Sequence, residues 1–115
     1  MAKGNKFTGG GMNNNMNSMI KQAQKMQAEM ERIQAETEEK TVEATAGGGA
    51  VSVTMKGSRD LVSIKLSPEI VDPDDIEMLE DLIIAAVNEA TKKANDMMEE
   101  SMRAVTGGLN VPGLF

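Results

Sequence analysis

Carboxylates are the most numerous side chains in this sequence that could do chemistry. Eight of them fall in two groups, Asp72, Asp74, Asp75, Glu77, Glu80 and Asp81 near a predicted helix start, and Glu99 and Glu100 further along. A carboxylate pair works as acid and base only where its surroundings separate the two pKa values. At a helix start, carboxylates favour the positive end of the helix dipole and face solvent. We therefore expect these carboxylates to form a solvated helix face rather than a catalytic pair. The alternative is a hard-cation site at Asp72, Asp74 and Asp75, although their spacing lacks the glycine and the final glutamate of a calcium loop.

Other catalytic chemistries lack the residues that they need. The chain has no cysteine and no histidine, which excludes a thiolate nucleophile, a Cys/His metal site and a histidine-activated serine. The run Gly47 to Gly49 lacks the Gly-Lys-Ser/Thr ending of a phosphate-binding loop, so it is interpreted as a hairpin turn. We predict no catalytic residue, no metal, no cofactor and no small-molecule substrate. A metal-dependent enzyme built on the clustered carboxylates is the weakest of three hypotheses.

Basic residues are the remaining candidates, and they are unevenly distributed. The net charge is −6, yet residues 1–28 contain four lysines and no acidic residue. The candidate residues are Lys3, Lys6, Lys21, Lys25, Lys92, Lys93 and Arg103. Lys21 and Lys25 are four residues apart and therefore share one face of a predicted helix. Such residues either solubilise the chain or contact the phosphates of a nucleic acid.

The apolar composition limits the kind of partner and the compartment. Phe7 and Phe115 are the only aromatic residues, so there is no stacking platform for single-stranded nucleic acid. No window reaches the ~18 apolar residues of a membrane span, and residues 1–11 lack the apolar stretch of a secretory signal. We expect a cytoplasmic protein without a membrane partner.

The lysines at positions 21 and 25 must be positioned by a long helix. We expect this helix over residues 12–38, after a disordered leader at residues 1–11. Its apolar residues recur at alternating steps of three and four, as in a coiled coil. This seam consists of Met16, Met19, Ala23, Met26, Met30, Ile33 and Thr37. At 1.5 Å per residue the helix is ~40 Å long.

After this helix the hydrophobic period falls to two, which is typical of strands. The pattern predicts a three-stranded antiparallel meander over residues 41–66 with one apolar face. A second helix follows, with Asp72 as its N-cap and Pro73 in its first turn, and ends near Val105. The fold class is therefore α+β, with a single α-β-β-β-α domain at residues 12–106 and an irregular tail at residues 107–115.

The predicted monomer leaves part of its first helix uncovered. Strands of about seven residues are ~23 Å long, whereas the helix is ~40 Å long. A sustained heptad pattern indicates packing rather than a ligand site. We therefore expect a homodimer, because a two-fold symmetric contact covers such a stripe with a second copy of itself. The predicted interface residues are Met16, Met19, Met26, Met30 and Ile33.

Three segments together resemble a known family. They are Met19-Ile20-Lys21-Gln22-Ala23-Gln24-Lys25-Met26-Gln27, then Ile64-Lys65-Leu66-Ser67-Pro68-Glu69-Ile70-Val71, and then residues 77–90, EMLEDLIIAAVNEA. This combination is similar to the YbaB/EbfC nucleoid-associated proteins of bacteria, over roughly residues 12–115. The glycine-rich hairpin and the composition of the tails also fit this family.

The resemblance implies a tweezer-like homodimer that binds duplex DNA with low sequence specificity and alters its conformation. It further implies a place in the nucleoid and a role in nucleoid organisation and gene regulation. The implied DNA contacts are Lys21 and Lys25 on the first helix, with Lys92, Lys93 and Arg103 on the second. The alternative is a protein–protein interaction adaptor that uses the methionine-rich seams and does not bind nucleic acid.

Overall fold

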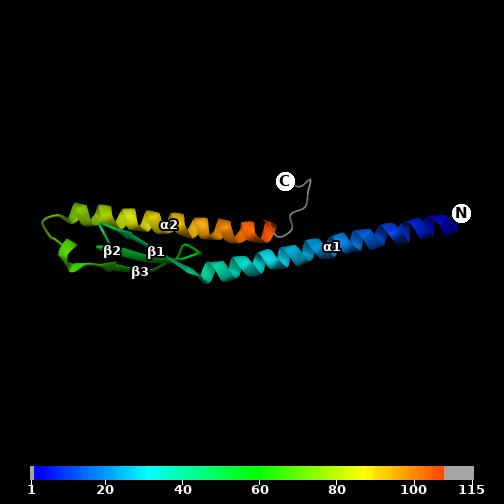
Figure 1. The fold of residues 1–115 in the computed structure, drawn as a ribbon, viewed down its shortest axis with the longest axis horizontal. Coiled ribbons are helices and arrows are strands. Elements are labelled where there is room, and N and C mark those ends of the chain that lie inside the picture. The colour runs from blue at the N-terminus through cyan, green and yellow to red at the C-terminus, as the bar shows by residue number, and fades with distance from the viewer. Residues whose placement is uncertain (1, 108–115) are drawn as a thin grey trace. The chain divides into compact units, whose positions relative to one another are not determined.

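The computed structural model describes the backbone of residues 2–107 and the side chains of residues 15–105. The elements follow in the order α1 (Ala2–Glu39), β1 (Thr41–Ala46), β2 (Val51–Lys56), β3 (Leu61–Leu66), a short 3-10 helix (Pro68–Ile70) and α2 (Ile76–Gly107). The chain divides into two units, residues 1–32 and residues 33–115. The first unit is a single length of helix, and the second contains the sheet and α2 (Figure 1). The predicted α+β order of helix, meander and helix is confirmed.

Helix α1 differs from the sequence prediction at its start. Its backbone is helical from Ala2, where a disordered leader over residues 1–11 and a helix from residue 12 were expected. Glycine in a helix interior costs about 1 kcal/mol relative to alanine, and this cost made the run Gly9 to Gly11 an argument against helix. At the other end, the Thr37 hydroxyl donates to the Ile33 carbonyl at 2.7 Å, and Thr37 is 1% exposed.

The three strands form an antiparallel sheet in the order β1-β2-β3, as predicted. Residues paired across antiparallel strands point to the same face. Val53 on β2 therefore shares its face of the sheet with its two partners, Ala44 on β1 and Ile64 on β3. The glycine run lies in the β1–β2 turn, where Gly47, Gly48 and Gly49 have φ of 62°, 68° and 95°. Glycine adopts such angles without a steric penalty.

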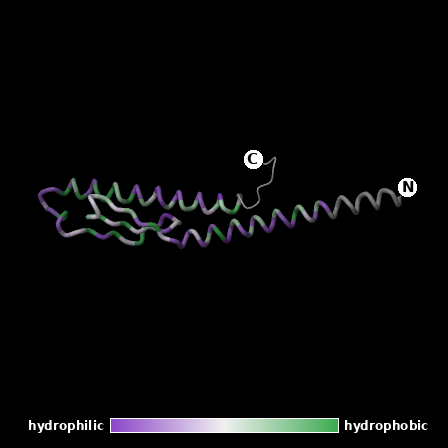
Figure 2. The backbone as a smooth tube through the Cα atoms, in the orientation of Figure 1, coloured by the Kyte–Doolittle hydropathy of each residue, from purple (hydrophilic) through white to green (hydrophobic). Residues whose placement is uncertain are grey.

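Helix α2 covers the apolar face of the sheet, chiefly over β1 and β2. Ala86, Ala90 and Ala94 follow one another at four-residue steps and are completely buried. Their small side chains let the helix lie close to Val51 and Val53, which are also completely buried. Figure 2 shows hydrophobic residues recurring along both the strands and α2. The predicted apolar stripe of α2 thus supplies three of the seven buried apolar residues of the described core.

The inner face of β3 is less covered than that of its neighbours. Ile64 and Leu66 pair with Val53 and Val51, yet they are 39% and 38% exposed. Leu61 and Val62, at the start of β3, are also exposed. These four exposed apolar residues lie on one edge strand. Together they form a larger apolar surface than the scattered single residues that are normal on a protein. The second unit therefore presents β3 as an unfinished edge of its core.

The start of α2 corrects one sequence prediction. The helix begins at Ile76, so Asp72 is not its N-cap and Pro73 lies outside it. The Met78 amide donates to Asp75 Oδ1 at 3.3 Å, which makes Asp75 the cap, while Asp72 Oδ1 accepts from the Asp74 amide at 3.0 Å. Both aspartates can accept in this way. The sequence pattern could not distinguish them because each is followed by further acidic residues.

Candidate nucleic-acid interface

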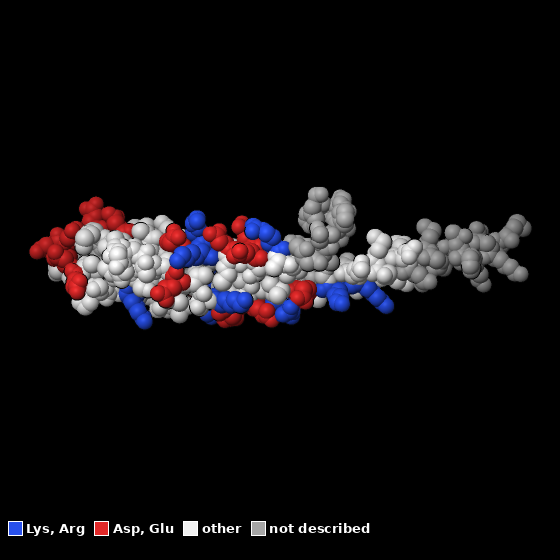
Figure 3. All heavy atoms as spheres, viewed as in Figure 1, with Lys and Arg blue, Asp and Glu red and all other residues white. Residues whose placement is uncertain are grey.

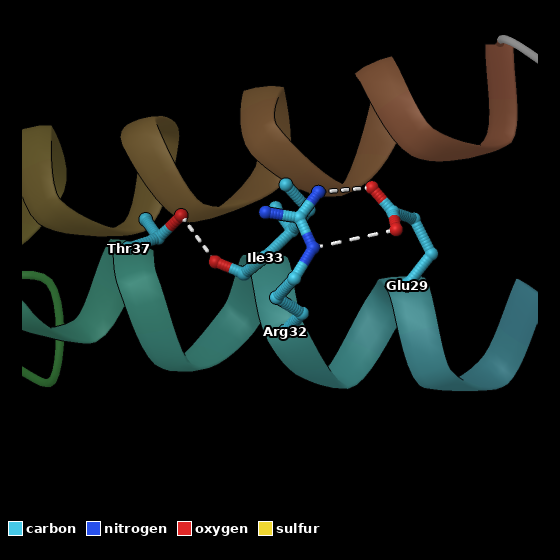
Figure 4. A network of polar contacts seen from close by, with 4 residues as sticks. All are labelled: Glu29, Arg32, Ile33 and Thr37. Carbon is cyan, nitrogen blue, oxygen red and sulfur yellow. Dashed lines mark hydrogen bonds and ion pairs between the residues drawn. The ribbon is translucent and has the colours of Figure 1, made fainter.

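Lys21 and Lys25 lie on the part of α1 that belongs to the first unit. Both side chains are exposed, and their four-residue spacing places them on one face of the helix. Arg32 forms an ion pair with Glu29 one turn further along, and its Nε donates to Glu29 Oε2 at 3.3 Å (Figure 4). The hydrogen bond from Arg32, and to a lesser degree the charge of Lys25, lowers the pKa of Glu29. Glu29 is the first acidic residue of the chain and follows Lys25 by four residues, so the lysine pair precedes every carboxylate of α1.

Lys92 and Lys93 are adjacent in sequence but have different surroundings. Lys93 Nζ donates to the Glu43 backbone carbonyl at 2.9 Å, so it connects α2 to β1. Lys92 Nζ lies 3.7 Å from Asp96 Oδ2, in an ion pair whose side chains are both well exposed. Exposed pairs of this kind are weak and are readily exchanged for another anion. Both side chains are exposed, but Lys93 is joined to β1 by its hydrogen bond, whereas the ion pair of Lys92 lies within its own helix.

Arg103 lies on α2 in a hollow that the sequence did not reveal. The hollow has a volume of about 650 Å³, is open to solvent, and is lined by Arg59, Asn95, Met98, Glu99, Met102 and Arg103. Arg59 comes from the turn between β2 and β3, and its Nη1 donates to Asn95 Oδ1 at 3.0 Å. Two guanidinium groups, from elements far apart in sequence, are thereby brought to one site.

The turn that carries Arg59 has a strained backbone at that residue. Its amide donates to the Lys56 carbonyl at 2.8 Å, and the Lys56 amide donates to the Asp60 carbonyl at 2.9 Å. This is a short hairpin loop whose last position is left-handed, and Arg59 has φ of 72°. Glycine commonly occupies such a position, because the left-handed region costs a residue with a Cβ atom about 1–2 kcal/mol. The left-handed φ of Arg59 and its contact with Asn95 are both features of the folded chain, so the sequence carried no clear signal for this residue.

Charge is separated along the second unit. The segment from residue 67 to residue 81 contains seven acidic residues and no basic one, while the rest of the chain has twelve basic and eleven acidic residues. Figure 3 shows this acidic segment gathered at the end of the unit where α2 begins. Most of the negative charge therefore lies at this acidic end, since the rest of the second unit holds seven basic and nine acidic residues. The remainder of the whole chain reaches a net charge of +1 because residues 1–32 add five basic and two acidic residues.

Other predicted site residues contribute no cluster of ligands. Among the residues that the structure describes, no three acidic side chains converge to hold a metal ion, and the carboxylates of Asp72 and Asp75 accept backbone hydrogen bonds. Lys3 and Lys6 lie on the helical backbone of α1, and their side chains are outside the described residues. No helix in the described part of the chain is long and apolar enough to cross a membrane.

The described chain is thus a small α+β protein of helix, three-stranded meander and helix, with exposed basic side chains on both helices. The chain belongs to the YbaB/EbfC DNA-binding family, whose model matches residues 12–109. The sequence-based recognition of this family is therefore confirmed. It is a family of nucleoid-associated DNA-binding proteins and not a family of enzymes.

Curated relatives match over nearly the whole chain. A nucleoid-associated protein of Acetivibrio thermocellus is 58% identical over 116 residues and covers 100% of both chains. One of Alkaliphilus metalliredigens is 57% identical over 109 residues, covering 95% of this chain and 96% of its own. The fold is similar to the crystal structure of uncharacterized protein HP0035 from Helicobacter pylori, with a TM-score of 0.56 at 21% identity, covering 76% of this chain and 96% of that one.

Proposed function

We propose that this protein binds duplex DNA as a homodimer with low sequence specificity and alters its conformation in the nucleoid. The observation that carries the proposal is the match of residues 12–109 to a DNA-binding family. The names of the curated relatives support nucleoid association. A role in nucleoid organisation and gene regulation follows from binding of this kind, because a protein that changes DNA shape at many sites changes access to them.

The DNA contacts are proposed to be phosphate contacts from basic side chains. Lys21 and Lys25 are exposed on one face of α1, and no acidic residue precedes Glu29. Lys3 and Lys6 extend the same positive segment, and Lys92 and Arg103 add contacts from α2. Contacts to phosphate carry no sequence information directly, which accounts for low specificity. A dimer doubles each contact.

The homodimer is proposed on the apolar residues that one chain leaves exposed. Met16 and Met19 of the α1 seam are 56% and 68% exposed. Ile64 and Leu66 of β3 lie on the core face of the sheet and are also exposed. A second copy of the chain supplies matching apolar surfaces for both stripes under two-fold symmetry. The proposed interface comprises Met16, Met19, Met26, Met30 and Ile33 on the seam, with Ile64 and Leu66 added from the sheet.

The DNA proposal is tested by fluorescence anisotropy with labelled duplexes of unrelated sequence. We expect similar affinities for all duplexes and a steep decrease with salt, because log K falls by about 0.9 per log unit of salt for each phosphate neutralised. Absence of binding to every duplex at about 50 mM salt, where phosphate contacts are strong, would refute the proposal. Fluorescence energy transfer between the two DNA ends then measures whether bound DNA is bent.

The dimer is tested by light scattering of the purified protein at micromolar concentration, where a monomer mass would contradict it. The alternative function, a protein–protein interaction adaptor, is favoured by the same exposed methionines, because methionine adapts to varied partners. A nuclease-treated pull-down separates the two. A defined partner that remains bound without nucleic acid, together with absent DNA binding, would replace the DNA proposal.

A further inference from the structure

Arg59 is held over the second half of α2 by its own turn and by Asn95. Its backbone is left-handed at φ of 72°, and Nη1 donates to Asn95 Oδ1 at 3.0 Å. Backbone strain of this kind persists where surrounding structure over-determines it, and it concentrates at functional sites. A glycine would satisfy the turn without strain, but it would leave the hollow without this guanidinium.

The hollow has the composition of a phosphate-binding site. Arginine presents five N–H donors in a planar fork that fits phosphate, and the bond to Asn95 uses one of them. Arg103 lines the same hollow from α2. The apolar side chains of Met98 and Met102 complete part of the lining and offer a surface to the sugar beside a phosphate. Glu99 also lines the hollow, and its carboxylate opposes an anion there.

The position of the hollow also fits an anionic partner. It lies between residues 95 and 103 of α2, about 30 Å along the helix from the acidic first turns. That separation exceeds the screening length of about 8 Å at physiological ionic strength. The acidic end of the unit therefore acts little on the hollow. The carboxylates near the hollow are Glu99 on its lining and, in the same stretch of α2, Glu100 and Asp96, of which Asp96 is paired with Lys92.

We propose that Arg59 and Arg103 bind one backbone phosphate of duplex DNA in this hollow, with Arg59 as a DNA-contacting residue on the β2–β3 turn. This inference rests on the proposed DNA-binding function. It adds a contact from the sheet to those expected from the helices. The hollow therefore fixes where DNA runs along α2.

The test compares the DNA affinity of Arg59→Gly with that of the unaltered protein. Glycine suits the left-handed turn, so the variant keeps its fold, which circular dichroism and light scattering check. Arg59→Asn is a second variant that tolerates this conformation. We expect either change to weaken binding about three- to tenfold at about 0.1 M salt and to reduce the salt slope by about 0.9 for each protomer engaged.

Lys65→Gln is the matched control, because it removes one exposed positive charge from β3, away from the hollow. We expect it to weaken binding less than Arg59→Gly does. Glu99→Gln is expected to strengthen binding, since it removes the opposing carboxylate. In nuclear magnetic resonance spectra the Arg59 Nε–H signal should shift on addition of duplex.

The outcomes separate this inference from the function on which it rests. Suppose that the unaltered protein binds duplex and that Arg59→Gly loses no affinity, or loses no more affinity than Lys65→Gln does. The hollow is then not a phosphate site, and the DNA-binding function stands. If the unaltered protein binds no duplex at about 50 mM salt, where phosphate contacts are strong, both proposals fail.

Discussion

A Cβ atom added to Gly57 would lie 2.1 Å from the backbone carbonyl oxygen of Thr37. The turn after β2 therefore contacts the end of α1 backbone to backbone. The contact is reinforced by the Gly57 amide, which donates to the Lys40 carbonyl at 2.8 Å, and by the ion pair of Lys56 with Glu39 at 3.2 Å. Glycine is needed at position 57 because a side chain would not fit against the backbone of Thr37. The glycines of the β1–β2 turn are needed instead for their positive φ.

We expect Gly57→Ala to lower the free energy of unfolding by about 3 kcal/mol, the upper part of the range for overpacking. A backbone oxygen cannot move aside as a flexible side chain can. Urea denaturation measures the change. Gly48→Ala is the control, since open space surrounds its Cβ position and only its φ of 68° opposes the change; about 1–2 kcal/mol is expected. Equal losses for the two variants would contradict the close contact.

The ion pair of Glu29 with Arg32 predicts a specific pH dependence. The folded state lowers the pKa of Glu29, chiefly through the Arg32 hydrogen bond. The pair therefore stabilises α1 above the ordinary carboxyl range, and this contribution disappears as the pH falls through the lowered pKa. Arg32→Gln should raise the pKa of Glu29, as measured by a nuclear magnetic resonance titration of its side chain. Lys25→Gln should raise it less, and the reverse order would exclude Arg32 as the main cause.

Lys92 and Lys93 should respond in opposite ways to substitution. Lys93→Ala removes a hydrogen bond to the Glu43 carbonyl and should lower the free energy of unfolding by about 0.5–1.5 kcal/mol. Lys92→Ala removes an exposed ion pair worth about 0–1 kcal/mol and should act on DNA affinity instead. Thermal denaturation of both variants measures the change in stability, and fluorescence anisotropy of both measures the change in DNA affinity. A larger loss of DNA affinity in Lys93→Ala than in Lys92→Ala would contradict this division of roles.

The double variant Lys21→Glu with Lys25→Glu should weaken DNA binding at least tenfold and reduce the salt slope by about two units per protomer. Both side chains are exposed, so circular dichroism should be unchanged. The control is Gln22→Glu with Gln24→Glu, which adds negative charge to exposed positions beside the lysines without removing a phosphate contact. Full affinity in the lysine variant would exclude both residues from the DNA contact.

Ile64→Asp should dissociate the proposed dimer, because it places a charge on the exposed core face of β3. Lys65→Asp, on the opposite face of the same strand, is its control and should remain dimeric. Met19→Asp tests the α1 seam in the same way. Light scattering gives the mass of each variant. A monomer from Met19→Asp alone would locate the interface on α1, and one from Ile64→Asp alone would locate it on the sheet.

Much of the fold was predictable because it follows from local periodicity. The change from the seven-residue seam of α1 to alternating Val51, Val53 and Met55 predicts a helix followed by strands. The predicted start of α2 was wrong by three residues, since several aspartates offer equivalent N-caps. The role of Arg59 was not predictable, because its contact with Asn95 joins positions 36 residues apart.

The sequence by itself determined the α+β order, the family and the exclusion of histidine and cysteine chemistry. These depend on residue types and on spacings of a few positions, which the chain carries without folding. The tertiary structure alone decided that α2 covers β1 and β2 while the inner face of β3 stays exposed. It also decided that Lys93 bonds to β1, and that Arg59 and Arg103 share one hollow. Each of these depends on which distant backbone segments pack together, and close packing, not local propensity, sets that arrangement.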